Sequence, residues 1–310
     1  MTTSFDHPLD SSDADPANSA VTVQDLDIHL PDAQRWTRPL RRVLRGVSCE
    51  VPRGQVTALV GTNGAGKTTL LRALSGALAA SSGTIEVLGV PLGGAEDSLP
   101  AGVGIVPDVP CHPDHWTADD LVLAQRRVEP AYDAHLTGRL LRRAGIAPDA
   151  QLRRLSAGQR TRLLLAVALG IRPELLLLDE PFARLDPLAR TDVLDELREH
   201  QAGGEDRTIL LSTHDLGEID RFVDHVVLLH EGWVVLEGSA IDLVEEHLVA
   251  TTAVPGREAH AEVLRGARRS GDQLEALVRA EDAVGLDQLT DLRRATLQDI
   301  LTFTLREVSR

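Results

Sequence analysis

The sequence predicts an α/β fold in which an open parallel sheet carries a ligand site at the carboxyl ends of its strands. Apolar runs at 56–60 and 175–178, and a run at 208–214 that ends in His214, predict buried strands with glycine or polar residues at their ends. The first run leads through a glycine-rich loop into a helical pattern that extends to Leu78. Because ligands of open parallel sheets bind where the strands end, the polar residues after these runs form the candidate site.

The composition narrows the class of protein. The chain has 310 residues and a net charge of -15, which disfavours nonspecific nucleic-acid binding. No apolar stretch is long enough for a membrane span, and the acidic segment 1–20 lacks the basic start of a secretory signal. Cys49 and Cys111 show no metal-binding spacing, which predicts free thiols. We therefore expect a cytoplasmic protein with a disordered acidic N-terminus and no nucleic-acid partner.

The glycine-rich loop after the first strand matches the phosphate-binding motif G-x-x-x-x-G-K-[ST] in full. Glycines let successive N–H groups point at phosphate oxygens, and the helix that follows adds its positive end. Lys67 is the only lysine of the chain, and a planar arginine would not fit the same cradle. The sequence thus predicts an ATP site with Mg²⁺ on the Thr68 hydroxyl; its residues are Gly61, Asn63, Gly64, Ala65, Gly66, Lys67, Thr68 and Thr69.

The second and third strands deliver the candidate catalytic groups. Asp179 and Glu180 follow the run of leucines at 175–178, and the strand predicted at 208–214 ends in His214. Phosphoryl transfer depends on positioning, metal and charge compensation. We expect Asp179 to hold Mg²⁺, Glu180 to activate the attacking water, and His214 to contact the γ-phosphate.

A short motif, Leu-Ser-Ala-Gly-Gln-Arg at 155–160, precedes a helical pattern at 159–169. A serine and small residues before a helix favour anion binding at its N-terminus. An ordinary helix cap has the same local sequence, so the motif alone leaves both interpretations open.

These four motifs, in this order and at these spacings, resemble the ATP-binding cassette ATPases over roughly residues 20–240. The resemblance implies a phosphate-loop core with an antiparallel β-subdomain and a helical insert at about 110–170, together spanning 21–240. It further implies a head-to-tail dimer, either a homodimer or a heterodimer with a close relative. In such a dimer Ser156, Gly158 and Gln159 contact the ATP of the partner, and Trp36 stacks on adenine.

Three positions depart from the family pattern. Asp108 stands where the family has glutamine, and its carboxylate is expected to approach Mg²⁺ through water. Ala157 replaces a signature glycine, and Arg184 replaces a small residue in the loop that links the two sites of the dimer. No catalytic group is lost.

Residues 241–310 predict a small C-terminal α/β appendage. Residues 241–249 look helical, a loop follows at 251–256, and Thr296 is placed to cap an amphipathic helix. The apolar face of that helix comprises Leu297, Ile300, Leu301 and Leu305.

The resemblance favours the ATP-hydrolysing subunit of an exporter that drives a separate membrane permease. The permease would contact the insert near 108–120, with Trp116 and the helix start at 117–121 as candidates. The alternatives are a soluble single-cassette ATPase with a non-transport role and a nonhydrolytic binding module. Glu180 and His214 argue against the latter.

Overall fold

The computed structural model describes residues 18–31, 40–93, 99–217, 219–253, 263–286 and 291–309. Trp36 and most of the acidic segment 1–20 lie outside these ranges, so the adenine-stacking and disorder predictions stay predictions. No helix within the described ranges is long and apolar enough to cross a bilayer. Cys49 and Cys111 are free thiols, as expected.

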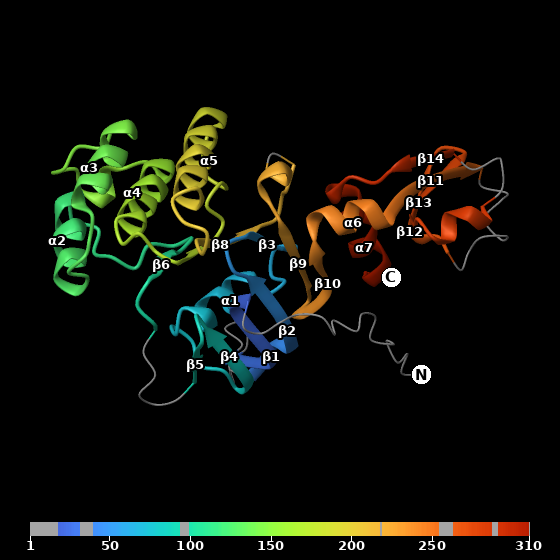
Figure 1. Cartoon of the computed structure of the whole chain (residues 1–310), viewed down its shortest axis with the longest axis horizontal. Coiled ribbons are helices and arrows are strands. Elements are labelled where there is room, and N and C mark those ends of the chain that lie inside the picture. The colour runs from blue at the N-terminus through green and yellow to red at the C-terminus, as the bar shows by residue number, and fades with distance from the viewer. Residues whose placement is uncertain are drawn as a thin grey trace.

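A six-stranded sheet forms the centre of the molecule (Figure 1). Its neighbouring strands run parallel except for the last hairpin, in which β10 is antiparallel to β9. The strands, in sheet order, are β10 (Trp233–Ser239), β9 (His225–His230), β3 (Val56–Val60), β8 (Thr208–Thr213), β7 (Leu175–Leu178) and β6 (Val103–Val106). The apolar runs in the sequence predicted β3 and β7 with their observed bounds, whereas β8 ends at Thr213, one residue before the predicted His214.

Both faces of this sheet are buried, which explains why its strands read as continuous apolar runs. Successive side chains of a strand point to opposite faces. Ala58 therefore packs in a core with α4 and α5 (Pro187–Gln201), whereas its neighbour Leu59 packs against α1 (Lys67–Leu74). Helix α1 ends at Leu74, one turn before the predicted Leu78.

A four-stranded antiparallel sheet covers the α1 side, as the resemblance implied. Its strands are β2 (Leu40–Pro52), β1 (Ser19–Pro31), β4 (Ser82–Val87) and β5 (Val90–Leu92). The helical insert lies at one end of the molecule and contains α2 (Ala118–Val128), α3 (Ala134–Arg143) and α4 (Ala157–Leu169). Short 3-10 turns occur at Leu152–Arg154, Asp220–Phe222 and Asp282–Gly285.

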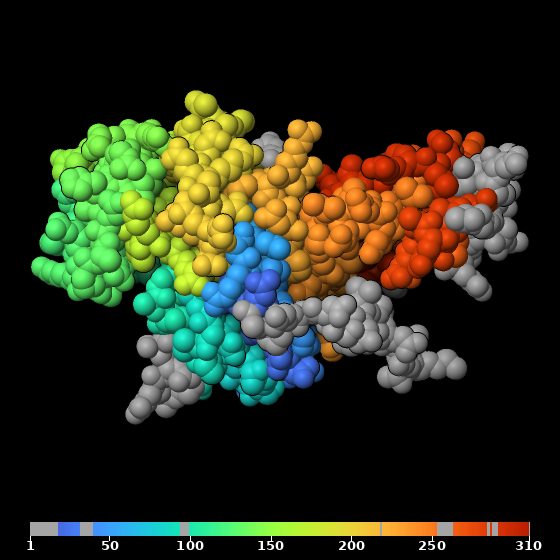
Figure 2. All heavy atoms as spheres, viewed as in Figure 1, coloured from blue at the N-terminus to red at the C-terminus, as the bar shows by residue number. Residues whose placement is uncertain are grey.

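The C-terminal appendage lies at the opposite end of the molecule from the insert (Figure 2). It starts with α6 (Ala240–Glu246) and continues into a second antiparallel sheet of order β12-β13-β11-β14. The bounds are β11 (His247–Ala253), β12 (Arg265–Ser270), β13 (Gln273–Arg279) and β14 (Asp291–Arg294). Helix α7 (Leu297–Val308) packs on this sheet and is capped by Thr296 as the sequence indicated; the structure adds that Asp299 completes a capping box.

Two predictions for the appendage are wrong. Residues 247–249 were expected to be helical and instead begin β11, and residues 251–253, expected in a loop, complete the same strand. Their backbone pairs with β13 and β14 on both sides, and Val249 is fully buried, so long-range pairing outweighs the local helical pattern. The predicted fold class, a phosphate-loop α/β core with an antiparallel subdomain, a helical insert and a small appendage, is confirmed.

Candidate nucleotide site

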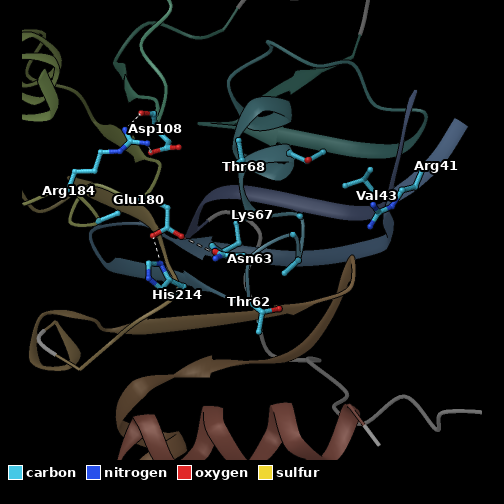
Figure 3. Close-up of a pocket in the computed structure, with 15 residues that line it drawn as sticks. Arg41, Val43, Thr62, Asn63, Lys67, Thr68, Asp108, Glu180, Arg184 and His214 are labelled. Carbon is cyan, nitrogen blue, oxygen red and sulfur yellow. Dashed lines mark hydrogen bonds and ion pairs between the residues drawn. The ribbon is translucent and has the colours of Figure 1, made fainter. Parts of the chain in front are cut away.

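A cavity of about 490 Å³ opens at the carboxyl ends of β3, β7 and β8, where the sequence placed the site (Figure 3). The predicted loop forms one wall, and Glu180 and His214 form another. The lining residues are Arg41, Val43, Thr62, Asn63, Gly64, Ala65, Gly66, Lys67, Thr68, Thr69, Asp108, Glu180, Ala183, Arg184 and His214.

Glycine is required in the phosphate loop for two separate reasons. Gly66 has a φ of 115°, which side chains rarely adopt, and a Cβ there would lie 2.6 Å from the Leu44 Cδ2 atom. Gly61 has no such torsion, but a Cβ would lie 2.3 Å from the Leu229 carbonyl oxygen. The loop is thus held tightly between β2 and β9, and helix α1 begins directly at Lys67.

Lys67 connects the loop to the catalytic carboxylate. Its side chain is only 6% exposed, and its ammonium donates to the Gly61 carbonyl oxygen at 2.7 Å. The same nitrogen lies 3.2 Å from Glu180 Oε1, while His214 Nδ1 lies 2.9 Å from Glu180 Oε2 (Figure 3). The structure therefore brings together the three residues that the sequence singled out for catalysis.

The backbone of Glu180 is held in an unusual conformation. Its φ is +49°, in the left-handed region that non-glycine residues adopt at a cost. The Glu180 N–H donates to the Ser212 hydroxyl at 2.8 Å, and that hydroxyl donates to Asp179 Oδ1 at 2.7 Å. Ser212 is fully buried on β8 and thus orients both carboxylate residues from behind.

The donor set around Asp179 suits Mg²⁺. The Thr68 hydroxyl donates to Asp179 Oδ1 at 3.2 Å, so two oxygen ligands from different motifs lie side by side. Within the described residues there is no group of three or more acidic, histidine or cysteine side chains able to hold a metal by themselves. The Thr68 and Asp179 oxygens suit Mg²⁺, for which one or two protein ligands act together with water and substrate phosphates.

Asp108 lines the cavity but is engaged by Arg184. Arg184 Nη2 lies 2.8 Å from Asp108 Oδ1, and Arg184 Nη1 donates to the Asp108 carbonyl oxygen at 2.8 Å. Asp108 and Arg184, the two departures from the family pattern that introduce a charge, therefore form an ion pair with each other. The expectation that Asp108 approaches Mg²⁺ stays a prediction.

The signature residues lie elsewhere. Among the described residues that line the cavity, Ser156, Gly158 and Gln159 are absent. Ser156 caps α4: its hydroxyl accepts the Gln159 N–H at 3.1 Å, and the Gln159 side chain accepts the Ser156 N–H at 3.1 Å. Within one chain the motif is thus a helix cap, and it remains exposed for a further contact.

Several residues of the site were not singled out from the sequence, among them Ser212, Arg41 and Val43. Ser212 was not singled out, although a serine in an otherwise apolar buried strand, two residues before His214, is a usable signal. Arg41 and Val43 line the cavity from β2, and no local pattern distinguishes them.

The parallel sheet, the phosphate loop and the Lys67–Glu180 pair define a phosphate-loop nucleoside triphosphatase. A family described as "ABC transporter" matches residues 44–183. A "Nod factor export ATP-binding protein I" from Rhizobium sp. (strain N33) is 35% identical over 215 residues, which is 66% of this chain and 69% of the relative. "Manganese transport system ATP-binding protein MntA" from Synechocystis sp. is also 35% identical, over 68% of this chain and 84% of the relative.

Among solved structures, an ATP-binding subunit of an ABC transporter has a TM-score of 0.61 and 28% identity, covering 73% of this chain and 92% of that one. The chain belongs to the ABC transporter family of ATP-binding proteins. It is an ATP-binding, ATP-hydrolysing transporter subunit, which confirms the main functional prediction over a soluble non-transport ATPase. One structural neighbour, at 18% identity, is described as a dimeric ATP-binding cassette, and another, at 28% identity, as part of an ABC transporter complex.

Proposed function

We propose that this chain hydrolyses MgATP in the cavity next to Lys67 and uses the energy to drive export through a separate membrane permease. The observation that carries the proposal is the contact of Glu180 with both Lys67 and His214 at the mouth of the phosphate loop. Loop N–H groups and Lys67 bind the β- and γ-phosphates, because both present positive charge to the cavity. Thr68 and Asp179 hold Mg²⁺, which supplies charge neutralisation on the phosphates when bound.

In this proposal Glu180 takes the proton of the attacking water. Its Oε2 lies 2.9 Å from His214 Nδ1, so the imidazole orients the carboxylate. His214 is half-exposed at the cavity, which leaves its ring free to hydrogen-bond the γ-phosphate. Lys67 neutralises Glu180 at 3.2 Å and is expected to turn to the phosphates when nucleotide enters.

The second half of the proposed site comes from another cassette. Ser156, Gly158 and Gln159 lie at the exposed start of α4 and outside the cavity of their own chain. In a head-to-tail dimer, homo- or heterodimeric, the same helix start would face the γ-phosphate bound by the partner. The adenine would stack on Trp36, which precedes in the sequence the strand β2 that brings Arg41 and Val43 to the cavity.

The export direction is supported by relatives named for Nod factor export, whereas MntA is named for manganese transport. The proposed permease contact is the insert face from Asp108 to Asp120. There Thr117 caps α2 through a capping box with Asp120, and Val109 is 64% exposed. Bound there, the chain would lie on the cytoplasmic side of the membrane.

A mixing experiment tests the shared site. Lys67→Ala and Ser156→Arg are each expected to abolish ATP hydrolysis, the second by placing bulk and charge at the interface. Mixed in equal amounts, the two variants form heterodimers with one site in which Lys67 and Ser156 are both intact. Recovery of activity on mixing supports the head-to-tail arrangement; mixtures as inactive as the single variants contradict it.

Co-expression with a candidate polytopic membrane permease tests the transporter role. We expect the pair to co-purify in detergent and the membrane subunit to change the ATPase rate. Substituting Val109 by Asp should weaken the co-purification without unfolding the chain, because the side chain is exposed. Unchanged co-purification would contradict the proposed contact face.

A further inference from the structure

The nucleotide cavity shares a wall with a second cavity. This second cavity, of about 390 Å³, lies between the segment 107–110 and the start of α4. Asp108 and Arg184 line both cavities. The Asp108–Arg184 pair is therefore the boundary between the nucleotide and the helical insert.

The geometry of the pair fixes the orientation of Arg184. One guanidinium nitrogen contacts the Asp108 carboxylate at 2.8 Å and another donates to the main-chain carbonyl of the same residue at 2.8 Å. A planar fork that grips one residue at two points has little rotational freedom, unlike a lysine ammonium. Asp108 follows β6, the strand that leads into the insert, so the grip joins the insert to the loop after Glu180.

The same loop is held from a second side. A Cβ on Gly158 would lie 3.0 Å from the Arg184 carbonyl oxygen and 3.3 Å from Leu185 Cδ2. The first turn of α4 thus packs directly on the backbone of the Arg184 loop. The Arg184 loop therefore contacts both the segment that leads into the insert, at Asp108, and the start of α4, at Gly158.

A path also leads from Arg184 back to Glu180. The Ala183 N–H donates to the Glu180 carbonyl oxygen at 3.2 Å, and the Leu185 N–H donates to the Phe182 carbonyl oxygen at 3.2 Å. Consecutive turns therefore connect the two residues. A shift of Arg184 would displace the backbone of Glu180, whose φ of +49° is already held against its preference.

Stability is a poor explanation for the pair. The side chains of Arg184 and Asp108 are 42% and 32% exposed, and ion pairs with this exposure add little to folding free energy. The Asp108–Arg184 ion pair adds little to stability but borders two cavities. A role in positioning the loop after Glu180 explains it better.

We propose that Arg184, gripped by Asp108, is a positioning residue for ATP hydrolysis: it ties the insert to the loop that carries Glu180. Asp108 in this chain then holds Arg184 and is not a ligand of Mg²⁺. The inference rests on the proposed role of Glu180. It predicts that breaking the grip lowers the turnover of bound ATP and leaves nucleotide and metal affinity in place.

The test compares Asp108→Ala, Arg184→Ala, Arg184→Lys and the Asp108→Ala/Arg184→Ala double variant. Each single alanine variant is expected to lower kcat roughly tenfold, because small misplacements of catalytic groups are costly. The double variant should be no slower than the singles, since both remove the same contact. Arg184→Lys should resemble Arg184→Ala, because an ammonium lacks the fork.

Binding measurements separate the two roles of Asp108. The Kd of a fluorescent ATP analogue in EDTA, and the Mg²⁺ concentration for half-maximal activity, should stay within about twofold of the parent. A Mg²⁺ requirement that rises about tenfold in Asp108→Ala but not in Arg184→Ala would make Asp108 a metal ligand and overturn the proposal. Two other results would also overturn the proposal. One is a kcat of the double variant reduced by the product of the two single effects, and the other is a parental kcat in both single alanine variants.

Arg268→Ala is the matched control. Arg268 pairs with Glu275 at 2.6 Å on the appendage and has a similar exposure, 45%. Arg268→Ala should leave kcat, the Kd of the ATP analogue and the Mg²⁺ requirement unchanged. Thermal unfolding of every variant checks the fold. If Glu180→Gln kept full activity, the role of Glu180 would fail, and that result is distinguishable from a parental kcat in the Arg184 variants.

Discussion

Lys67 Nζ lies 3.2 Å from Glu180 Oε1, which joins the phosphate loop to the carboxylate strand by a buried contact. The two residues are 113 positions apart in sequence and come from β3–α1 and β7. Lys67 is held from behind by the Gly61 carbonyl, so its ammonium is already aimed at the cavity. Binding of the phosphates therefore requires a change of partner for this amine and no large rearrangement of its stem.

Lys67→Ala should weaken ATP binding roughly 100-fold, because it removes a charge-assisted contact in a desolvated loop. Lys67→Arg should weaken ATP binding nearly as much. The Lys67 side chain is only 6% exposed and lies against the Gly61 carbonyl, so the larger guanidinium does not fit there. Isothermal titration measures both affinities. Because Lys67 carries the only side-chain amine, amine modification mapped to its peptide also reports this site, and ATP should protect it. Parental affinity in Lys67→Ala would refute the loop assignment.

Glu180→Gln should lower kcat by roughly 100-fold or more while ATP still binds, because the amide cannot accept the proton of water. The variant is expected to accumulate as an ATP-bound dimer, visible by light scattering after size-exclusion chromatography. His214→Ala is its companion: losing the 2.9 Å contact should slow turnover less than losing Glu180 itself. A Glu180→Gln protein that hydrolyses ATP at the parental rate would assign the base elsewhere.

Ser212→Ala tests the buried support of the two carboxylates. It leaves Asp179 Oδ1 and the Glu180 N–H each short of one partner, which should raise the Mg²⁺ requirement roughly tenfold. The same loss should lower the free energy of unfolding by about 1 to 3 kcal/mol. Ser75→Ala, whose hydroxyl donates to the Arg72 carbonyl at the end of α1, is the control. If Ser75→Ala changed the Mg²⁺ requirement and the free energy of unfolding as much as Ser212→Ala, Ser212 would have no specific role in supporting Asp179 and Glu180.

Glu237 on β10 predicts a pH dependence of stability. Burial raises the pKa of its carboxyl to about 7, and the group accepts the Glu50 N–H at 2.8 Å. Between about pH 4.5 and 7 the unfolded chain has lost this proton and the folded chain keeps it, so stability falls as pH rises. Glu237→Gln keeps the acceptor and removes the titration. Denaturant unfolding should show the variant more stable than the parent at pH 8, by about 2 kcal/mol, and equal at pH 4. Equal differences at both pH values would contradict this.

The fold of the core could be predicted from short sequence motifs because each motif suits only one local structure. The glycine loop requires conformations that few residues adopt, and runs such as Leu175–Leu178 suit a strand buried on both faces. Thr296 and Asp299 likewise specify the start of α7 within four residues. Residues 247–249 were mispredicted because their strand pairs with segments at 273–279 and 291–294, and no local pattern encodes such partners.

The chemistry can be recognised from the amino-acid sequence alone: one phosphate loop with a single lysine, two carboxylates after a buried strand, and a histidine at the end of another. Phosphate, metal and water require these residue types, so each motif can be recognised separately. The residues that support these groups are visible only in the folded chain, because they lie on neighbouring strands and on segments far apart in the sequence. The tertiary structure placed Ser212 behind Asp179 and Glu180, and it paired Asp108 with Arg184, 76 residues away. Each of these partners has an ordinary side chain, and its role arises from the residue it meets.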